Sequence, residues 1–174
     1  MNTTEEYVTN HVKGVRFKLF SIASKLIQRA RHHDESKLQE PEYSLWCKMD
    51  EEPRYKYGTK EYKDKIERYK EVFDLHYAAN RHHPEHYALG IDDMDLIDMI
   101  EMVCDWISYK KDITIREAID MIDIQGTRYN MSTQLMNILK NTLFNHFSTL
   151  VEQSKSYPDL KTSKDSKHLI DISV

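Results

Sequence analysis

The chain has 174 residues, of which 40% are hydrophobic and 31% charged, and this balance is typical of one soluble globular domain with its own core. Its formal net charge of -4 argues against a protein that binds nucleic acid by bulk electrostatic attraction. No apolar run is long enough to cross a membrane and "MNTTEEYVTNH" lacks the features of a signal peptide, so we expect a cytoplasmic protein without a membrane partner.

Long helices are favoured over short strands, because the chain contains only four Gly and four Pro. The first expected helix runs from about Glu5 to Arg31, with His11 beside its apolar stripe. The stripe residues are spaced alternately by four and three, as on one helix face: Val8, Val12, Val15, Leu19, Ile22 and Leu26. This pattern leaves open whether the segment is one straight helix or two.

The middle of the chain predicts three more helices. "HHDESKLQEP" is a break, after which Pro41 suits the first turn of a helix that carries Trp46. A long helix is expected from about Glu61 to His83 and ends before Pro84, because the residue before a proline avoids helical geometry. A helix over residues 93–110 is hydrophobic on most sides, which indicates a central, buried position.

Two last helices are predicted over "ITIREAIDMIDIQG", with Gly126 as its stop, and "STQLMNILKNTLFNHFSTLVEQ". The two cysteines, Cys47 and Cys104, are not clustered and indicate reduced thiols that fill the core. We therefore predict an all-α protein: a single helical domain of five to seven helices over residues 1–153, followed by a mobile tail over residues 154–174.

Histidine is concentrated in two short stretches. "RHHDESK" contains His33 followed directly by Asp34, and "NRHHPEHY" holds three of the nine histidines within eight residues. On a helix that continues to His83, the side chains of His76, Asn80 and His83 share one face, because they are spaced four and three residues apart. Such a cluster indicates either a metal site or a polar surface that is rich in histidine.

An acidic row lies on the most hydrophobic expected helix, where Asp98, Glu101 and Asp105 are spaced three and four residues apart. Unpaired carboxylates on a buried helix are costly, so this row needs cations, a metal or solvent beside it. Taken singly, the row could be a solvated face, Asp34 a helix cap and His11 a packing histidine. Taken together, the imidazoles and carboxylates favour one pocket that suits a transition metal such as Zn, Mn, Fe or Ni.

The order of these residues resembles the HD-domain metal-dependent phosphohydrolases, which have an early histidine, an adjacent His-Asp pair and a later aspartate. The resemblance implies an HD-like helical bundle whose basic metal site is formed by His11, His33, Asp34 and Asp105. On a single straight helix, however, His11 and His33 would lie roughly 33 Å apart. The ligand role of His11 therefore requires a turn between them, and without one His76 or His83 takes its place.

The stretch "HDESK" is also similar to the HDxGK variant of the HD-GYP cyclic-dinucleotide phosphodiesterases. This similarity implies that Lys37 is an active-site lysine near the phosphate. That branch adds a lone histidine and a His-His pair, which His76 and His82-His83 match in order, so a second metal is implied. We regard His82 as the weakest candidate, because on a continuous helix it points away from the face of His76 and His83.

A closer resemblance is to an uncharacterised family spread through bacteriophages and bacteria, whose members show HDxSK, HHPEHY and EMVxDW motifs. This chain contains "HDESK", "NRHHPEHY" and "EMVCDW" in that order within residues 5–110. A member encoded by a bacteriophage would act in the host cytoplasm.

The resemblance implies a metal-dependent phosphohydrolase that acts on a nucleotide or a nucleotide-derived phosphoester through a metal-activated water. We expect one divalent ion, or two (Mn, Fe, Zn, Ni, Co or Mg), bound by residues from the set His11, His33, Asp34, Asp105, His76 and His83. The residues expected to take part in catalysis are Asp34, Lys37, His83 and Glu101. Those expected to contact the substrate are Lys37, Asn80, Arg81, His86 and Tyr87.

Two alternatives belong to other functional classes. In the first, the same residues bind a metal in a non-catalytic phage protein that acts by contacting a host protein. In the second, the protein is an HD-type nuclease, although its negative charge weighs against a nucleic-acid partner. Homo-oligomer formation is left open.

Overall fold

The computed structural model describes residues 3–147 and confirms the all-α prediction. The described residues form seven α-helices and three short 3-10 helices, with no strand among them. The α-helices are α1 (Thr3–His32), α2 (Glu42–Glu51), α3 (Lys60–Arg68), α4 (Lys70–Ala79), α5 (Leu96–Ile107), α6 (Ile115–Arg128) and α7 (Thr133–Phe147). The 3-10 helices are η1 (Glu35–Leu38), η2 (Pro84–His86) and η3 (Gly90–Asp93). The tail predicted from residue 154 lies outside the described residues.

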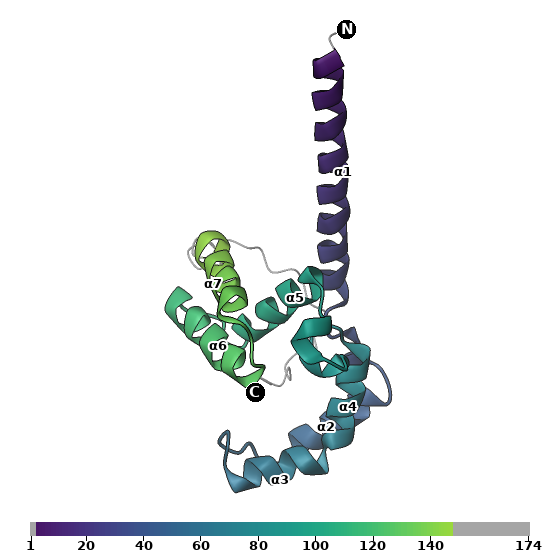
Figure 1. Ribbon diagram of the computed structural model, residues 1–174. Helices are drawn as coiled ribbons and strands as arrows, with labels where there is room; N and C mark the ends of the chain where they lie inside the picture. Colours follow the sequence, from purple (N-terminus) through teal and green to yellow (C-terminus); the bar gives the residue numbers. More distant parts are fainter. Residues whose placement is uncertain (1–2, 148–174) are drawn as a thin grey trace.

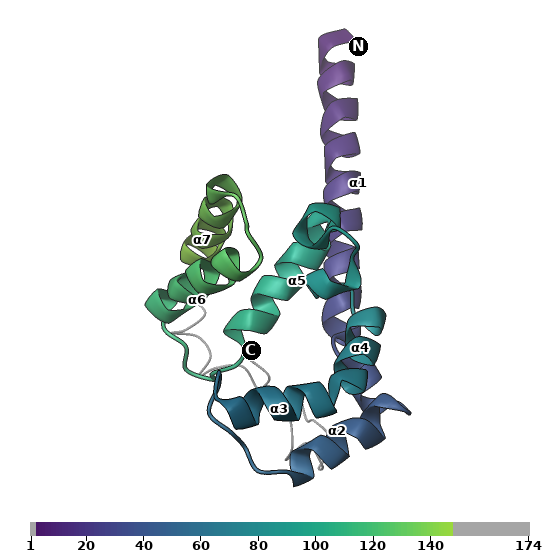
Figure 2. The ribbon, with the colours of Figure 1, turned by 60° about the horizontal axis from the view of Figure 1, so that its bottom comes forward.

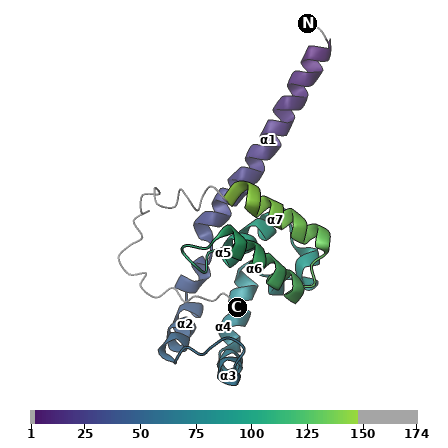
Figure 3. The ribbon, with the colours of Figure 1, turned by 90° about the vertical axis from the view of Figure 1, so that its left-hand side faces the viewer.

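Helix α1 projects from the rest of the molecule as a rod (Figures 1 and 3). It is one continuous helix of 30 residues, and none of its residues is buried. Its C-terminal end packs against α5, where Leu26 and Arg29 are partly covered. The turn that would have brought His11 back toward His33 is therefore absent from this helix. None of the described helices meets the length and apolarity that crossing a membrane requires.

The long helix expected over residues 61–83 is interrupted at Tyr69 and ends at Ala79. The Tyr69 hydroxyl donates to the carboxylate of Glu52 at 3.0 Å, and this tertiary contact accompanies the change of direction between α3 and α4. The side-chain amide of Asn80 donates through Nδ2 to the main-chain oxygen of His76 at 2.9 Å and to Ser36 Oγ at 2.8 Å. Such side-chain bonds compete with continued helix, so the chain from Asn80 onward follows a different path from the one that helical spacing predicts.

Apolar side chains form two groups. One lies between α5, α6 and α7 and contains Met102, Ile122 and Leu143, which have no exposed surface. The other lies between α2 and α4 and contains Trp46 and Val72. Helix α5 contacts both α1 and α6, and Figure 2 shows it between the rod and the α6–α7 pair. The predicted central position of this helix is therefore confirmed.

Helix α6 begins with a capping box: Thr114 Oγ1 accepts from the main-chain N–H of Glu117, and the Glu117 carboxylate accepts from the N–H of Thr114. Gly126, expected to stop this helix, lies inside it. A Cβ at Gly126 would lie 2.3 Å from the sulfur of Met136 on α7. The glycine therefore permits the close approach of α6 and α7, and it does not end the helix.

Candidate metal centre

Three separate segments bring metal-binding side chains together. The turn after α1 supplies His33 and Asp34, the end of α4 and the following loop supply three histidines, and α5 supplies Asp105. Two overlapping groups have ligand atoms that all lie within 4.8 Å of one another. The first is Asp34, His76, His82 and His83, and the second is His33, Asp34, His82 and Asp105.

Asp34 stands at the centre of both groups. Its backbone has a φ of 55°, a left-handed conformation that aspartate tolerates better than most residues. One carboxylate oxygen, Oδ1, lies 3.4 Å from His76 Nε2 and 3.5 Å from His82 Nε2. The other, Oδ2, lies 3.5 Å from His33 Nε2. The two oxygens of this carboxylate therefore face different sets of imidazoles.

The spacing of these atoms fits ligands of a shared ion. Two ligands that each lie about 2.1 Å from one ion are roughly 3.0–3.4 Å apart in tetrahedral or octahedral geometry. His33 Nε2 and Asp105 Oδ1 are 3.5 Å apart, close to that range. Among the described residues, Asp34 Oδ1 and His82 Nε2 are buried without a hydrogen-bond partner. Buried polar atoms are rarely left unpaired, so these two atoms are suited to a bound cation.

Two carboxylates outside the ligand groups orient the imidazoles. Glu101 lies 2.9 Å from His33 Nδ1 and 3.3 Å from His82 Nδ1, and it is also paired with Arg29. Glu42 lies 2.8 Å from His76 Nδ1. A carboxylate at Nδ1 holds the proton there and leaves the Nε2 lone pair free to bind a metal. All three Nε2 atoms point toward Asp34.

Electrostatics favour the metal-binding form of Asp34 and His83. Burial opposes the charge of Asp34, but Lys37 and His33 outweigh it and lower the pKa of this carboxyl group. Burial and the neighbouring histidines His82 and His76 lower the pKa of His83, which is therefore neutral at pH 7.

The exception is His33. Burial lowers its pKa, but hydrogen bonds to Asp105 and Glu101 and the charges of Asp34 and Asp105 outweigh burial and raise the pKa to about 10. The surplus negative charge around His33 is thus balanced by a proton, which a metal cation would displace.

The structure does not bring His11 to the cluster. This residue is exposed and lies 22 residues before His33, along a helix that is unbroken to His32, so the two are about 33 Å apart. Its expected ligand role is corrected on this geometry.

His82 replaces it. This side chain is 1% exposed and belongs to both ligand groups, although helical spacing made it the weakest candidate. Helical spacing gave the wrong direction for this side chain because α4 ends at Ala79, three residues before His82. Residues beyond the helix end do not follow helical periodicity.

Of the five residues expected to contact the substrate, three have separate partners and two share one partner. Lys37 lies at the cluster, with Nζ 2.7 Å from Asp34 Oδ2. The Asn80 amide is buried against Ser36 and His76, and His86 Nδ1 contacts the main-chain oxygen of Tyr77 at 2.8 Å.

The other two expected contacts, Arg81 and Tyr87, both bind Asp98. Arg81 forms a bidentate pair with it at 3.2 and 3.0 Å, and the Tyr87 hydroxyl donates to it at 2.5 Å. Arg29 also pairs with Asp98 at 3.2 Å. Asp98 thus pairs with two arginines and contacts no imidazole among the described residues, whereas Glu101, on the same helix face, contacts His33 and His82.

Sequence reasoning missed Glu42. It is 4% exposed and accepts hydrogen bonds from Trp46 Nε1 at 2.8 Å and from His76 Nδ1. No local pattern pointed to it, because its partner His76 is 34 residues away.

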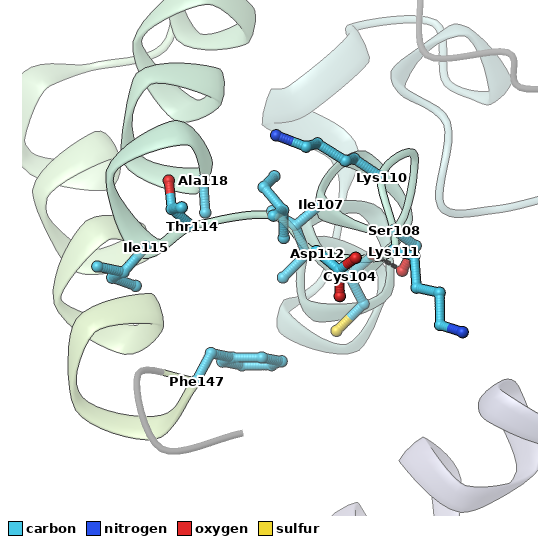
Figure 4. A pocket seen from close by; sticks show the side chains of 11 residues that line it. Cys104, Ile107, Ser108, Lys110, Lys111, Asp112, Thr114, Ile115, Ala118 and Phe147 are labelled. Carbon is cyan, nitrogen blue, oxygen red and sulfur yellow. Dashed lines mark hydrogen bonds between the residues drawn. The ribbon is translucent and has the colours of Figure 1, made fainter. Parts of the chain in front are cut away.

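A cavity of about 340 Å³ lies outside the cluster, between α5 and the start of α6. Figure 4 shows Cys104, Ile107 and Ile115 on its walls and Phe147 at its edge. None of the candidate metal ligands lines it, although Cys104 directly precedes Asp105 in α5.

Fold and cluster together define an all-α protein with histidine and aspartate side chains positioned to bind a metal ion. Residues 1–145 match the model of a family of unknown function, DUF5662, and the chain belongs to that family. No curated protein and no solved structure matches the chain.

Proposed function

We propose that the protein is a metal-dependent phosphohydrolase that acts on a nucleotide or a nucleotide-derived phosphoester. The observation that carries the proposal is the pair of overlapping ligand groups that share Asp34 and His82. The reaction class and the substrate class rest on the resemblance to HD-domain enzymes. In this proposal His33, Asp34 and Asp105 keep the places that the resemblance implies, and His82 takes the place of the early histidine.

A divalent ion in such a site lowers the pKa of a water molecule and polarises a phosphoryl oxygen. Asp34 is ionised at neutral pH, and its two oxygens face both ligand groups. Either ligand group would hold one ion, or the two groups together would hold two, with Asp34 contributing to each. His33 and Asp105 have side chains that are 32% and 30% exposed, so this side of the cluster is open to a substrate.

The remaining charged groups have distinct roles in this proposal. Lys37 is partly exposed beside Asp34 and supplies positive charge for a phosphate group. His83 is neutral at pH 7 because its pKa is lowered, which favours a ligand over a proton donor for the leaving oxygen. Arg81 and Tyr87 are bound to Asp98, and substrate contact through them requires those bonds to open.

Metal analysis combined with a hydrolysis screen tests the proposal. The purified protein, after loading with Mn²⁺ or Zn²⁺ and desalting, is expected to retain metal by elemental analysis. Asp34→Asn keeps the shape of the side chain but removes its charge, and it is expected to lose both metal and hydrolysis. Asp74→Asn is the matched control, because Asp74 is an exposed aspartate whose partner is Lys70 on the same helix.

The hydrolysis screen uses nucleoside monophosphates, cyclic nucleotides and single-stranded DNA. These three compound classes distinguish nucleotidase, phosphodiesterase and nuclease activity. Retained metal without hydrolysis of any of them would support the non-catalytic alternative. Absence of metal from the loaded wild type, with hydrolysis that Asp34→Asn does not change, would refute the site itself.

A further inference from the structure

Helix α1 exposes an apolar surface that the described part of the chain does not cover. Val8, Val12, Val15, Leu19 and Ile22 lie on one face and are 38% to 59% exposed. The next residue of this stripe, Leu26, is partly covered where α1 meets α5. The exposed part of the stripe, from Val8 to Ile22, therefore continues a helix face that already packs against another helix at Leu26.

A rod of this composition needs a packing partner. Isolated helices are marginal in water even for alanine-rich sequences, and proteins stabilise most helices by packing of an apolar face. The free part of α1 contains three valines, an isoleucine and Gly14, which have lower helix propensity than alanine. Its helical form is thus best explained by a partner along the stripe.

The spacing of the stripe fits a second helix. Alternating steps of four and three residues are the heptad pattern of helices that pack side by side at a shallow angle. A contact along about 20 residues is about 30 Å long and buries on the order of 500 Å² per copy, near the roughly 1,000 Å² total of a specific interface. Phe17 and Phe20 lie on the other side of α1 and outside this contact.

Charge indicates how the two helices are oriented. Helix α1 carries six Lys and Arg but only two acidic residues, Glu5 and Glu6, both in its first turn. Residues 33–147 carry 15 Lys and Arg against 23 Asp and Glu. Antiparallel packing brings the acidic start of each α1 toward the basic half of the other, and it keeps the two acidic bodies at opposite ends. Parallel packing would place the acidic bodies side by side.

We propose that α1 is a dimerisation element that pairs antiparallel with α1 of a second copy of this chain. In a pair centred between Val12 and Val15, Val8 of one copy faces Leu19 of the other, and Val12 faces Val15. The contact is isologous, because each residue pair occurs twice about the two-fold axis. It is independent of the proposed enzymatic function.

Sedimentation of the full chain tests this pairing. At about 50 µM the wild type is expected at twice the chain mass of 20.8 kDa. Leu19→Glu places a charge in the contact and is expected to weaken dimerisation at least about 100-fold, giving the single-chain mass. Asn10→Glu adds the same charge on the opposite side of α1 and is expected to remain dimeric. Val12→Glu repeats the test at a second stripe position.

The near-ultraviolet signal of the buried Trp46 and Trp106 shows whether a variant has kept its folded body. A folded but monomeric Leu19→Glu protein beside a dimeric control supports the pairing. A monomeric wild type, including one that binds vesicles of anionic lipid through its basic helix, overturns it. So does a dimer that survives both stripe substitutions.

Discussion

Asp34 and His82 are the two residues that belong to both ligand groups, so the cluster depends on them more than on any other side chain described. Both also carry a buried atom, Oδ1 in Asp34 and Nε2 in His82, without a hydrogen-bond partner among the described residues. Loss of either residue would remove a ligand from each group at once.

His82→Gln is therefore expected to weaken Zn²⁺ or Mn²⁺ binding by at least about 100-fold, beyond the 10–100-fold typical of residues that only orient a ligand. His11→Gln is expected to leave affinity unchanged, because His11 lies far along α1 from the cluster. Titration calorimetry with each metal measures both variants. Equal losses in the two variants would contradict the placement of His11.

At the residue scale, the candidate ligands implied by the HD-domain resemblance lie together in the structure where they are close in sequence or on one helix face. His33 and Asp34 are adjacent, and Asp105 lies one helical turn from Glu101 on α5. His82 was ranked as the weakest candidate and Glu42 was missed, for different reasons. The position of His82 depends on where α4 ends, and the role of Glu42 depends on contact with a distant histidine.

At the scale of elements, the capping box of α6 provides a test of helix stability against pH. Hydrogen bonds from Lys110 and from Thr114 lower the pKa of Glu117 to about 2. A lowered folded-state pKa means that the stabilising contribution is complete above the unfolded value of 4.5 and is lost as pH falls through about 2.

Glu117→Gln is expected to reduce the loss of melting temperature between pH 5 and pH 2 by a small amount, since this carboxylate is exposed. Glu71→Gln is the matched control: Glu71 is an exposed glutamate in the first turn of α4, whose N-cap residue makes no side-chain capping bond. Melting curves that depend on pH equally in wild type and Glu117→Gln would show that the cap contributes nothing.

Helices with regularly spaced apolar residues were predicted well, but the positions where other helices end were predicted less accurately. The stripe of α1 and the apolar surface of α5 gave helices close to the observed ones. The interruption at Tyr69 and the end at Ala79 coincide with side-chain bonds to Glu52 and Ser36, which come from earlier segments. Gly126 suggested a helix end, but close packing against Met136 accounts for it.

At the scale of the whole molecule, the candidate ligands connect the turn after α1, the α4 segment and α5. Helices α4 and α5 belong to different apolar groups. A metal that binds only the folded chain adds stability by mass action, about 2.7 kcal/mol at 100 times the dissociation constant. Saturating Mn²⁺ or Zn²⁺ is therefore expected to raise the melting temperature, and EDTA to reverse the effect.

Asp34→Asn is expected to melt at the same temperature with metal and with EDTA, because it lacks the central ligand. Differential scanning calorimetry of both proteins measures the difference. An equal metal-induced increase in Asp34→Asn would place the binding site elsewhere in the chain.

The end of α1 is attached to α5 partly by ion pairs and partly by packing at Leu26. Arg29, whose side chain is 25% exposed, pairs with both Asp98 and Glu101 of α5. Ion pairs of this kind weaken as salt screens them, so this part of the attachment is expected to weaken at high ionic strength. Glu101 also contacts His33 and His82, so the same carboxylate pairs with Arg29 of α1 and orients two candidate ligands. Removal of the Glu101 carboxylate would thus be expected to weaken the attachment of α1 and the orientation of both imidazoles together.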